Sequence, residues 1–370
     1  HSSYAIIIFA KNKHRNVMEL ALAFFLIYIV YFELRPIKVV KLDKHTEEAF
    51  KPVNLYRYNV ITHIHTQFSF DSLGKPSDIK KAMEENNIDF VFITDHDNTN
   101  YSYFEDEKIF AGIEKNTPDG RLLLLGNKLP VISHPHNFDF EHYRWKGEFK
   151  EGYLYEFIDP KDVIVWNKLL TGLTLIKNLF IYPITRRIVH KWNSLIPIDR
   201  WRNLYFTRAK KLNIIGGLDL HVKFVYQERT HGILIPSYRD GFKWLVNRVY
   251  SKKPLNTKDE VLESLANGNL YLAINQKFID IYAEDKEGIK LLGECVRLGG
   301  KFYVKTFKKS VSVLYCDGYA ILKTDKQEFS YKPEKEGDYH LEVYEYDFKI
   351  LNIYFGFRPV IITNKFKVVS

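Results

Sequence analysis

The feature that most constrains this chain is a series of short apolar runs that each end in histidine or a carboxylate. The first run ends at His63 and His65, and a second ends at Asp95 and His96. Residues i and i+2 of a strand lie on the same face, so His63 and His65 point the same way, about 7 Å apart along the chain. Two imidazoles at that spacing can hold one metal ion. Later runs end in similar residues, namely Glu114, His134, His136, Asp219 and His221. The pattern predicts a hydrolase with several metal ions.

In this order the clusters resemble the PHP superfamily (polymerase and histidinol phosphatase), a group of metal-dependent phosphoesterases. The resemblance extends over roughly residues 56–275. The family motif His-x-His is matched by His63 and His65, and the acidic residue that follows it by Asp71. The motif Thr-Asp-His is matched by Thr94, Asp95 and His96, and Gly-x-Glu by Glu114. His-Pro is matched by His134 and Pro135, and Gly-x-Asp-x-His by Gly217, Asp219 and His221.

The resemblance implies a site for two to three divalent ions, Mn²⁺, Zn²⁺ or Fe²⁺, that activates water and clamps a phosphoryl group. Glu114 would bridge two ions and act with His134 and Asp219 in catalysis. The ligands of the first ion would be His63, His65, Glu114 and Asp219, those of the second Glu114 and His134, and those of the third Asp71, His96 and His221. A further ligand of the second ion is open between Glu156 and His190. Asp95 is expected to be a structural group or to orient a neighbouring imidazole.

The predicted function is hydrolysis of a phosphoester, and the predicted partner is a phosphorylated small molecule, with no need for nucleic acid. The alternative is a non-catalytic, metal-stabilised binding or envelope-assembly module. A net charge of +9 suits an anionic partner, although surface lysines that only increase solubility would give the same balance. Candidate substrate contacts are His136, Arg144, Arg208 and Arg229, because imidazole and guanidinium groups can bind phosphate oxygens.

Strands and helices alternate through the first two thirds of the chain, which predicts an α/β fold. The resemblance implies a distorted (β/α)7 barrel of the PHP type, with its site at the carboxyl ends of the strands. Strands are expected at residues 88–94, 108–113, 122–125, 129–133, 154–158, 212–217 and 231–235, and helices from Pro76 and Thr257. Beyond Gly268 short alternating strands predict a β-sandwich-like domain. The predicted parts are an N-terminal extension with a hydrophobic helix (1–44), the PHP domain (45–275) and a β-rich domain (276–370).

Residues 20–32 are apolar and lie between Glu19 and Glu33. This run is short for a membrane span, which needs about 20 residues. We nevertheless expect an uncleaved membrane anchor, with a signal peptide or a buried segment as alternatives. The predicted location is therefore membrane-anchored, with the catalytic domain outside the cytoplasm and a cytoplasmic protein as the alternative.

Two further features leave alternatives open. Residues 160–211 are basic and rich in tryptophan, which fits helices covering the barrel, or a lid or membrane-surface patch. Cys295 and Cys316 form no Cys-x-x-Cys pair, so a thiolate zinc site is excluded. They are either one disulfide of an extracytoplasmic domain or two ordinary thiols.

Overall fold

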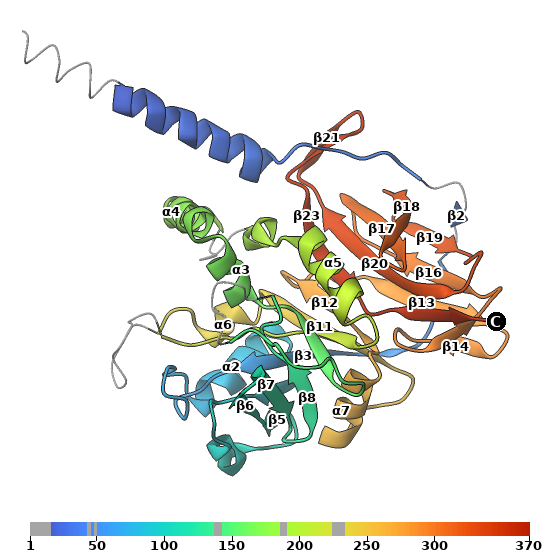
Figure 1. Ribbon diagram of the computed structural model, residues 1–370, viewed down its shortest axis with the longest axis horizontal. Coiled ribbons are helices and arrows are strands. Elements are labelled where there is room, and N and C mark those ends of the chain that lie inside the picture. Colours follow the sequence, from blue (N-terminus) through green and yellow to red (C-terminus); the bar gives the residue numbers. More distant parts are fainter. Residues whose placement is uncertain (1–15, 43–45, 48–49, 137–142, 186–190, 224–233) are drawn as a thin grey trace, which may run out of the picture.

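The computed structural model of the chain describes residues 16–42, 46–47, 50–136, 143–185, 191–223 and 234–370. Its architecture is mixed α/β, as predicted. In Figure 1 the strands between residues 56 and 274 form the lower half of the molecule and the C-terminal strands the upper half, with helix α5 between them. Arg229, His190 and most of the strand predicted at 231–235 lie outside the described residues.

The first sheet begins with parallel strands in the order β3-β4-β5 and continues through antiparallel β11 and β12. Strand β4 is apolar at every position and fully buried, as a strand covered on both faces must be. The bounds are β3 (Tyr56–Ile64), β4 (Phe90–Ile93), β5 (Ile109–Ala111), β11 (Leu245–Ser251) and β12 (Leu270–Ile274).

A second, five-stranded sheet runs in the order β10-β9-β8-β7-β6. The chain passes directly from β5 into this sheet at Gly112, where a Cβ would lie 2.4 Å from the carbonyl oxygen of Leu124. Its members are β6 (Ile113–Thr117), β7 (Gly120–Leu125), β8 (Leu129–Ile132), β9 (Leu154–Ile158) and β10 (Asn213–Gly216).

The two sheets meet without forming a closed ladder. At one junction the Asn247 side chain takes the place of strand pairing, because its amide binds both the N–H and the C=O of Gly216, each at 2.8 Å. Single bridges join Ile64 to Leu220 and His96 to Glu114 at the carboxyl ends of the strands. No sheet in the described residues closes on itself, so the seven-stranded barrel is not confirmed, although the strand ends converge as a barrel would require.

The helices begin where the sequence signals predicted. Helix α2 (Pro76–Asn86) has Pro at its start, and α7 (Lys258–Ala266) has a capping box in which Thr257 and Glu260 bind each other's backbone N–H. Residues 160–211 contain helices over the α/β half, namely α3 (Pro160–Trp166), α4 (Lys168–Thr185), η3 (Trp192–Leu195) and α5 (Ile198–Arg208). Further short helices are η2 (Asn100–Phe104) and α6 (Tyr238–Gly241).

The C-terminal half extends the first sheet, because β12 pairs with β23 and the order continues through β20, β24 and β15. Strands β17 and β18 add to this sheet, and β14-β13-β16-β19-β2 form another. Phe302 of β16 stacks on Phe366 of β24 at 4.8 Å, which packs the two sheets face to face. The bounds are β13 (Asp280–Asp285), β14 (Gly288–Lys290), β15 (Cys295–Arg297), β16 (Lys301–Lys305), β17 (Ser310–Cys316), β18 (Tyr319–Thr324), β19 (Glu328–Tyr331), β20 (Gly337–Glu345), β23 (Arg358–Thr363) and β24 (Phe366–Val369), with the short strands β1 (Ile37–Lys38), β2 (Thr46–Glu47), β21 (Phe348–Ile350) and β22 (Ile353–Phe355).

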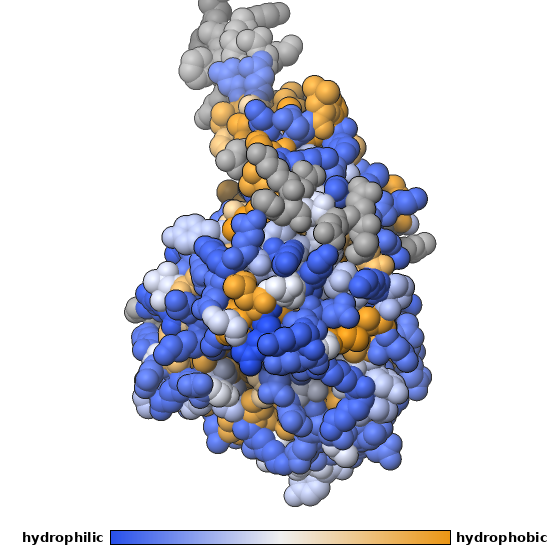
Figure 2. Space-filling view, turned by 90° about the vertical axis from the view of Figure 1, so that its right-hand side faces the viewer, coloured by the Kyte–Doolittle hydropathy of each residue, from blue (hydrophilic) through white to orange (hydrophobic). Residues whose placement is uncertain are grey.

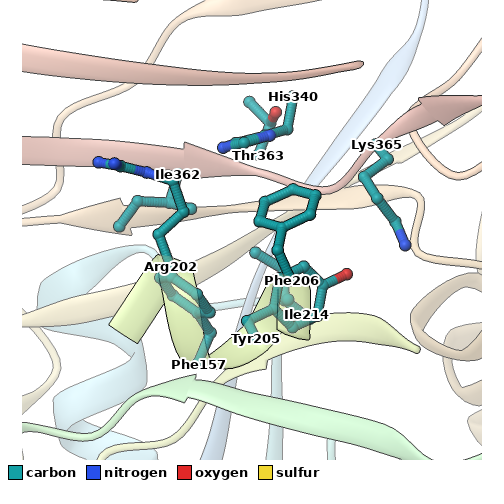
Figure 3. A pocket seen from close by; sticks show the side chains of 9 residues that line it. All are labelled: Phe157, Arg202, Tyr205, Phe206, Ile214, His340, Ile362, Thr363 and Lys365. Atoms are coloured by element: carbon teal, nitrogen blue, oxygen red, sulfur yellow. The ribbon is translucent and has the colours of Figure 1, made fainter. Parts of the chain in front are cut away.

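A buried ion pair ties α5 to this sheet. Arg202 donates to both carboxylate oxygens of Glu342 in β20, at 2.7 and 2.8 Å. Figure 3 shows Arg202 beside a small cavity of about 10 Å³, which Phe206 and His340 also line. The bidentate geometry holds the helix in one register on the sheet.

The predicted membrane anchor at residues 20–32 is wrong. Residues 16–28 are α-helical and continue into a π-helical turn, η1 (Ile29–Leu34), but no helix in the described part of the chain is long and apolar enough to cross a membrane. Glu33 pairs with Lys177 of α4, which places a charge at the end of the apolar run. The predicted membrane-anchored location loses its basis with this correction. Figure 2 shows apolar side chains gathered in the upper part of the molecule, where this helix and α4 expose residues such as Phe24, Leu179 and Phe180.

Both cysteines are free thiols, Cys295 exposed and Cys316 buried, so the structure contains no disulfide between them.

Candidate metal centre

The candidate ligands lie where strands of both sheets end, and their backbone there is unusual. His63, His134 and Asp219 have φ angles of 57°, 50° and 42°, in the left-handed region that residues other than glycine rarely adopt. His63 therefore sits in a bulge at the end of β3 rather than in the regular strand that the sequence pattern predicted. Such strain persists only where the surroundings hold it, and it concentrates at functional sites.

Glycine and backbone contacts bring the distant segments together. The N–H of His65 donates to Leu220, which joins the end of β3 to the loop that carries Asp219. Gly217 lies against this junction, where a Cβ would be 1.8 Å from Glu156 Oε1 and 2.9 Å from the Cβ of His63. The Gly-x-Asp-x-His motif thus needs its glycine for close packing.

The first group of ligands consists of four fully buried residues: His63, His65, Glu114 and Asp219. The Nε2 atoms of both histidines face the same two oxygens. His63 Nε2 lies 3.4 Å from Glu114 Oε2 and 3.5 Å from Asp219 Oδ1. For His65 Nε2 these distances are 3.3 and 3.1 Å. Four donors converge on one point from two strands and two loops.

The second group contains His65, Asp71, His96 and His221. Asp71 Oδ2 lies 3.2 Å from His96 Nε2 and 3.0 Å from His221 Nε2. The His65 ring stacks on both of the other imidazoles, with its centroid 4.4 Å from that of His96 and 4.1 Å from that of His221. Asp71 is half-buried, so this group lies nearer the surface than the first.

A third group surrounds His134, whose Nε2 lies 3.5 Å from Glu114 Oε1 and 3.5 Å from Asp219 Oδ2. Glu114 and Asp219 thus present one oxygen to the first group and the other to His134, the geometry of bridging carboxylates. Glu156 also lies here, but both its oxygens have partners. Oε1 is 2.6 Å from His63 Nδ1, and Oε2 accepts hydrogen bonds from Ser133 Oγ and from the N–H of His134. Glu156 therefore orients the His63 imidazole and fixes the backbone at His134, so both of its oxygens are engaged within the protein.

One observation in particular indicates that metal ions fit this set of donor atoms. Buried polar atoms are almost always hydrogen-bonded. Within the described residues, however, a set of buried ring nitrogens and carboxylate oxygens has no hydrogen-bond partner: His63 Nε2, His65 Nε2, both oxygens of Glu114 and Oδ1 of Asp219. These atoms point toward one another, and borderline divalent ions prefer such mixed nitrogen and oxygen ligands.

The electrostatics of the groups are strongly coupled. Burial opposes protonation of His63, but the carboxylates of Glu156 and Asp219 raise its pKa well above the ordinary value. Burial and the neighbouring His221 lower the pKa of His65 well below it. Burial alone would raise the pKa of Glu114, yet the imidazoles around it hold that pKa well below its usual range. Glu114 is thus held as the anion that a bridge between cations requires.

Two cations in the site were missed by sequence reasoning. Arg121 of β7, nearly fully buried, has Nη1 2.7 Å from His96 Nδ1 and 3.4 Å from Glu114 Oε1. Lys161 of α3 has Nζ 2.7 Å from Asp219 Oδ2. No motif marks either residue, since only the folded chain brings them to the carboxylates.

Three of the four predicted substrate contacts, His136, Arg144 and Arg208, lie within the described residues. His136 is buried and stacks on Trp201 at 4.4 Å between ring centroids, and burial lowers its pKa to about 3. Arg144 is half-buried in the loop that follows β8, and Arg208 is exposed at the end of α5. Asp95 has a structural contact: its oxygens accept hydrogen bonds from the N–H and hydroxyl of Thr66, which fix the turn after His65.

Comparison with known proteins gives one structural likeness to report. No protein-family model and no curated protein matches the chain. Among solved structures the chain is similar to a two-domain protein from Bacteroides vulgatus ATCC 8482 that contains a predicted PHP-like metal-dependent phosphoesterase. The identity is 10%, the match covers 87% of this chain and 99% of the other, and the TM-score is 0.37. This neighbour is of the class that the sequence motifs resemble, but so distant a likeness transfers no residue role.

Proposed function

We propose that the protein is a metal-dependent phosphoesterase that hydrolyses a small phosphorylated molecule. The observation that carries the proposal is the convergence of unpartnered buried donors around the two shared carboxylates, Glu114 and Asp219. When bound, the ions would lower the pKa of a water molecule and neutralise phosphoryl oxygens, which is the chemistry that phosphoester hydrolysis needs at neutral pH.

The residues of the chain have distinct tasks in this proposal. His63, His65, Glu114 and Asp219 hold one ion, and Asp71, His96 and His221, with His65 behind them, hold another. Glu114 and Asp219 turn their second oxygens toward His134, so that any cation placed there shares both carboxylates. Glu156 keeps Nε2 of His63 directed into the site and fixes the backbone of His134, whose ring nitrogen Nδ1 faces Asp159 and Asp162.

The test is a combined metal and activity measurement on the full chain. Purified protein is expected to contain about two to three divalent ions per chain after incubation with Mn²⁺ or Zn²⁺, as the clustered ligands imply. It is expected to hydrolyse p-nitrophenyl phosphate or bis-p-nitrophenyl phosphate. Glu114→Gln removes the bridging charge and is expected to lower turnover at least about a hundredfold.

Glu328→Gln, which changes an exposed glutamate of β19 in the same way, is the matched control and should keep full activity. Near wild-type activity of Glu114→Gln would show that Glu114 is not the bridge. Bound metal without activity on any phosphate ester would instead support a metal-stabilised binding module.

A further inference from the structure

Lys161 occupies an unusual place in the metal centre. It is the second residue of α3, whose start is fixed by Pro160 and by Asp159, which caps the helix by accepting a hydrogen bond from the N–H of Lys161 at 2.8 Å. The side chain is 46% exposed, yet its ammonium lies 2.7 Å from Asp219 Oδ2, on a side chain that is 0% exposed. Lys161 thus reaches from the solvent side of the site to its most buried carboxylate.

The ammonium lies at the third group of donors. Each of the three groups offers four residues with converging donor atoms, and the third consists of His63, His134, Glu156 and Asp159. Around His134 the additional members are Glu156 and Asp159, and both are engaged. Glu156 binds His63 and Ser133, while Asp159 caps α3 with one oxygen and lies 3.1 Å from His134 Nδ1 with the other. Among the described residues, Glu114 Oε1, His134 Nε2 and Asp219 Oδ2 face a common point beside this group.

Two of these three atoms already face a fixed positive charge, because Asp219 Oδ2 lies 2.7 Å from Lys161 Nζ and Glu114 Oε1 lies 3.4 Å from Arg121 Nη1. A divalent ion bound by Asp219 Oδ2 on this side would lie within a few ångströms of the ammonium, where like charges in a buried site repel strongly. The ammonium is in direct contact with Asp219, and the carboxylates of Glu114 and Asp159 also lie near it. An ammonium also supplies what a third ion would supply to a substrate, a compact positive charge for phosphate oxygens.

We propose that the Lys161 ammonium takes the place of a third metal ion. The protein then binds two ions, at the His63–His65 group and at the Asp71–His96–His221 group, and Lys161 provides the third positive charge beside Glu114 and Asp219. The half-exposed stem of Lys161 lets its ammonium also contact an incoming anion. This second role, contact with a phosphoryl oxygen of the substrate, rests on the proposed phosphoesterase function.

The number of bound ions tests directly whether the Lys161 ammonium takes the place of a third metal ion. The full chain is stripped with a chelator, dialysed against Mn²⁺ and analysed for bound metal by mass spectrometry. Wild type is expected to hold two ions, and Lys161→Ala and Lys161→His are expected to hold three, because the repelling charge is gone and histidine adds a donor. Lys168→Ala, at the exposed start of α4, is the matched control and should hold two. Circular dichroism and Tm confirm that each variant is folded.

Three ions in wild type would overturn the proposal, and so would two ions in both Lys161 variants. Activity measurements separate the replacement of an ion by Lys161 from the proposed phosphoesterase function. If the enzyme is active, Lys161→Gln is expected to raise KM for p-nitrophenyl phosphate about 10- to 100-fold, the value of one charged hydrogen bond, and Lys161→Arg to restore part of it. An unchanged KM would remove the substrate contact. A protein with the expected ion counts but no activity on any phosphate ester would refute the phosphoesterase function. It would still support the replacement of a third ion by Lys161.

Discussion

Replacement of Glu156 by glutamine tests whether the carboxylate behind the site sets the direction of the His63 imidazole. Oε1 of Glu156 lies 2.6 Å from His63 Nδ1, and Oε2 accepts from Ser133 Oγ at 2.8 Å and from the N–H of His134 at 3.0 Å. A carboxylate accepts at all three contacts, so the proton of the His63 ring stays on Nδ1 and Nε2 keeps its lone pair for a metal ion.

Glutamine cannot satisfy this arrangement in either orientation. With its NH₂ group toward His134, it opposes a backbone donor. With its NH₂ group toward His63, it forces Nδ1 to accept and moves the ring proton to Nε2, which faces Glu114 and Asp219. Either way one charged hydrogen bond is lost, worth about 1.5–3 kcal/mol. We therefore expect Glu156→Gln to weaken binding of the first ion about 10- to 100-fold, in line with the usual effect of groups behind metal ligands.

The assay is competition for Mn²⁺ or Zn²⁺ with a chelator of known affinity, with Tm measured on the metal-free protein. Glu328→Gln, on the surface of β19, controls for the loss of one negative charge. An affinity equal to wild type, or a variant that fails to fold even with bound metal, would refute the view that Glu156 acts by orienting His63.

Three further outcomes follow from particular contacts. Gly217→Ala should lower metal affinity, measured by the same competition, because its Cβ would lie 1.8 Å from Glu156 Oε1; unchanged affinity would show that the junction can move. Arg202→Met should cost about 3–5 kcal/mol of unfolding free energy in urea, since it leaves Glu342 buried without its partner, whereas Arg208→Met on the exposed end of the same helix should cost little; equal effects would contradict this. Burial opposes ionisation of Glu342, but its hydrogen bonds to His340 and Arg202 lower its pKa from 4.5 to about 2. Because the pKa of Glu342 is lower in the folded than in the unfolded state, this stabilisation is complete above about pH 4.5 and is lost as the pH falls toward 2. It amounts to about 3 kcal/mol in all. Urea unfolding between pH 6 and 3 should show this loss in wild type but not in a double variant without Arg202 and Glu342.

Local signals in the sequence predicted much of the first half of the chain. Proline at the start of α2 and the capping box of α7 act within one turn, so their effect does not depend on the rest of the fold. The fully apolar run of β4 likewise predicted a strand covered on both faces. Strand β11 was not predicted, because Asn247 and Arg248 make its centre polar. The structure gives the reason for Asn247, whose amide replaces the missing ladder beside Gly216.

The incorrect prediction of a membrane anchor shows how an apolar run in the sequence can mislead. An apolar run predicts burial or a membrane, but its length and its charged ends decide between them. The pairing of Glu33 with Lys177, which are far apart in the sequence, was invisible to a reading of the run itself.

The sequence by itself determined which residue types could bind metal and in what order they follow strands. Those residues, His63, His65, Glu114 and Asp219 among them, are brought together in the structure as the motif order predicted, although their roles as ligands stay predictions. Only the tertiary structure decided how their atoms are shared: that Glu156 contacts the His63 ring and the backbone of His134, and that Lys161 reaches Asp219. The physical reason is that a ligand's type is a property of one residue, whereas its direction, partner and charge environment depend on segments that meet only when the chain has folded.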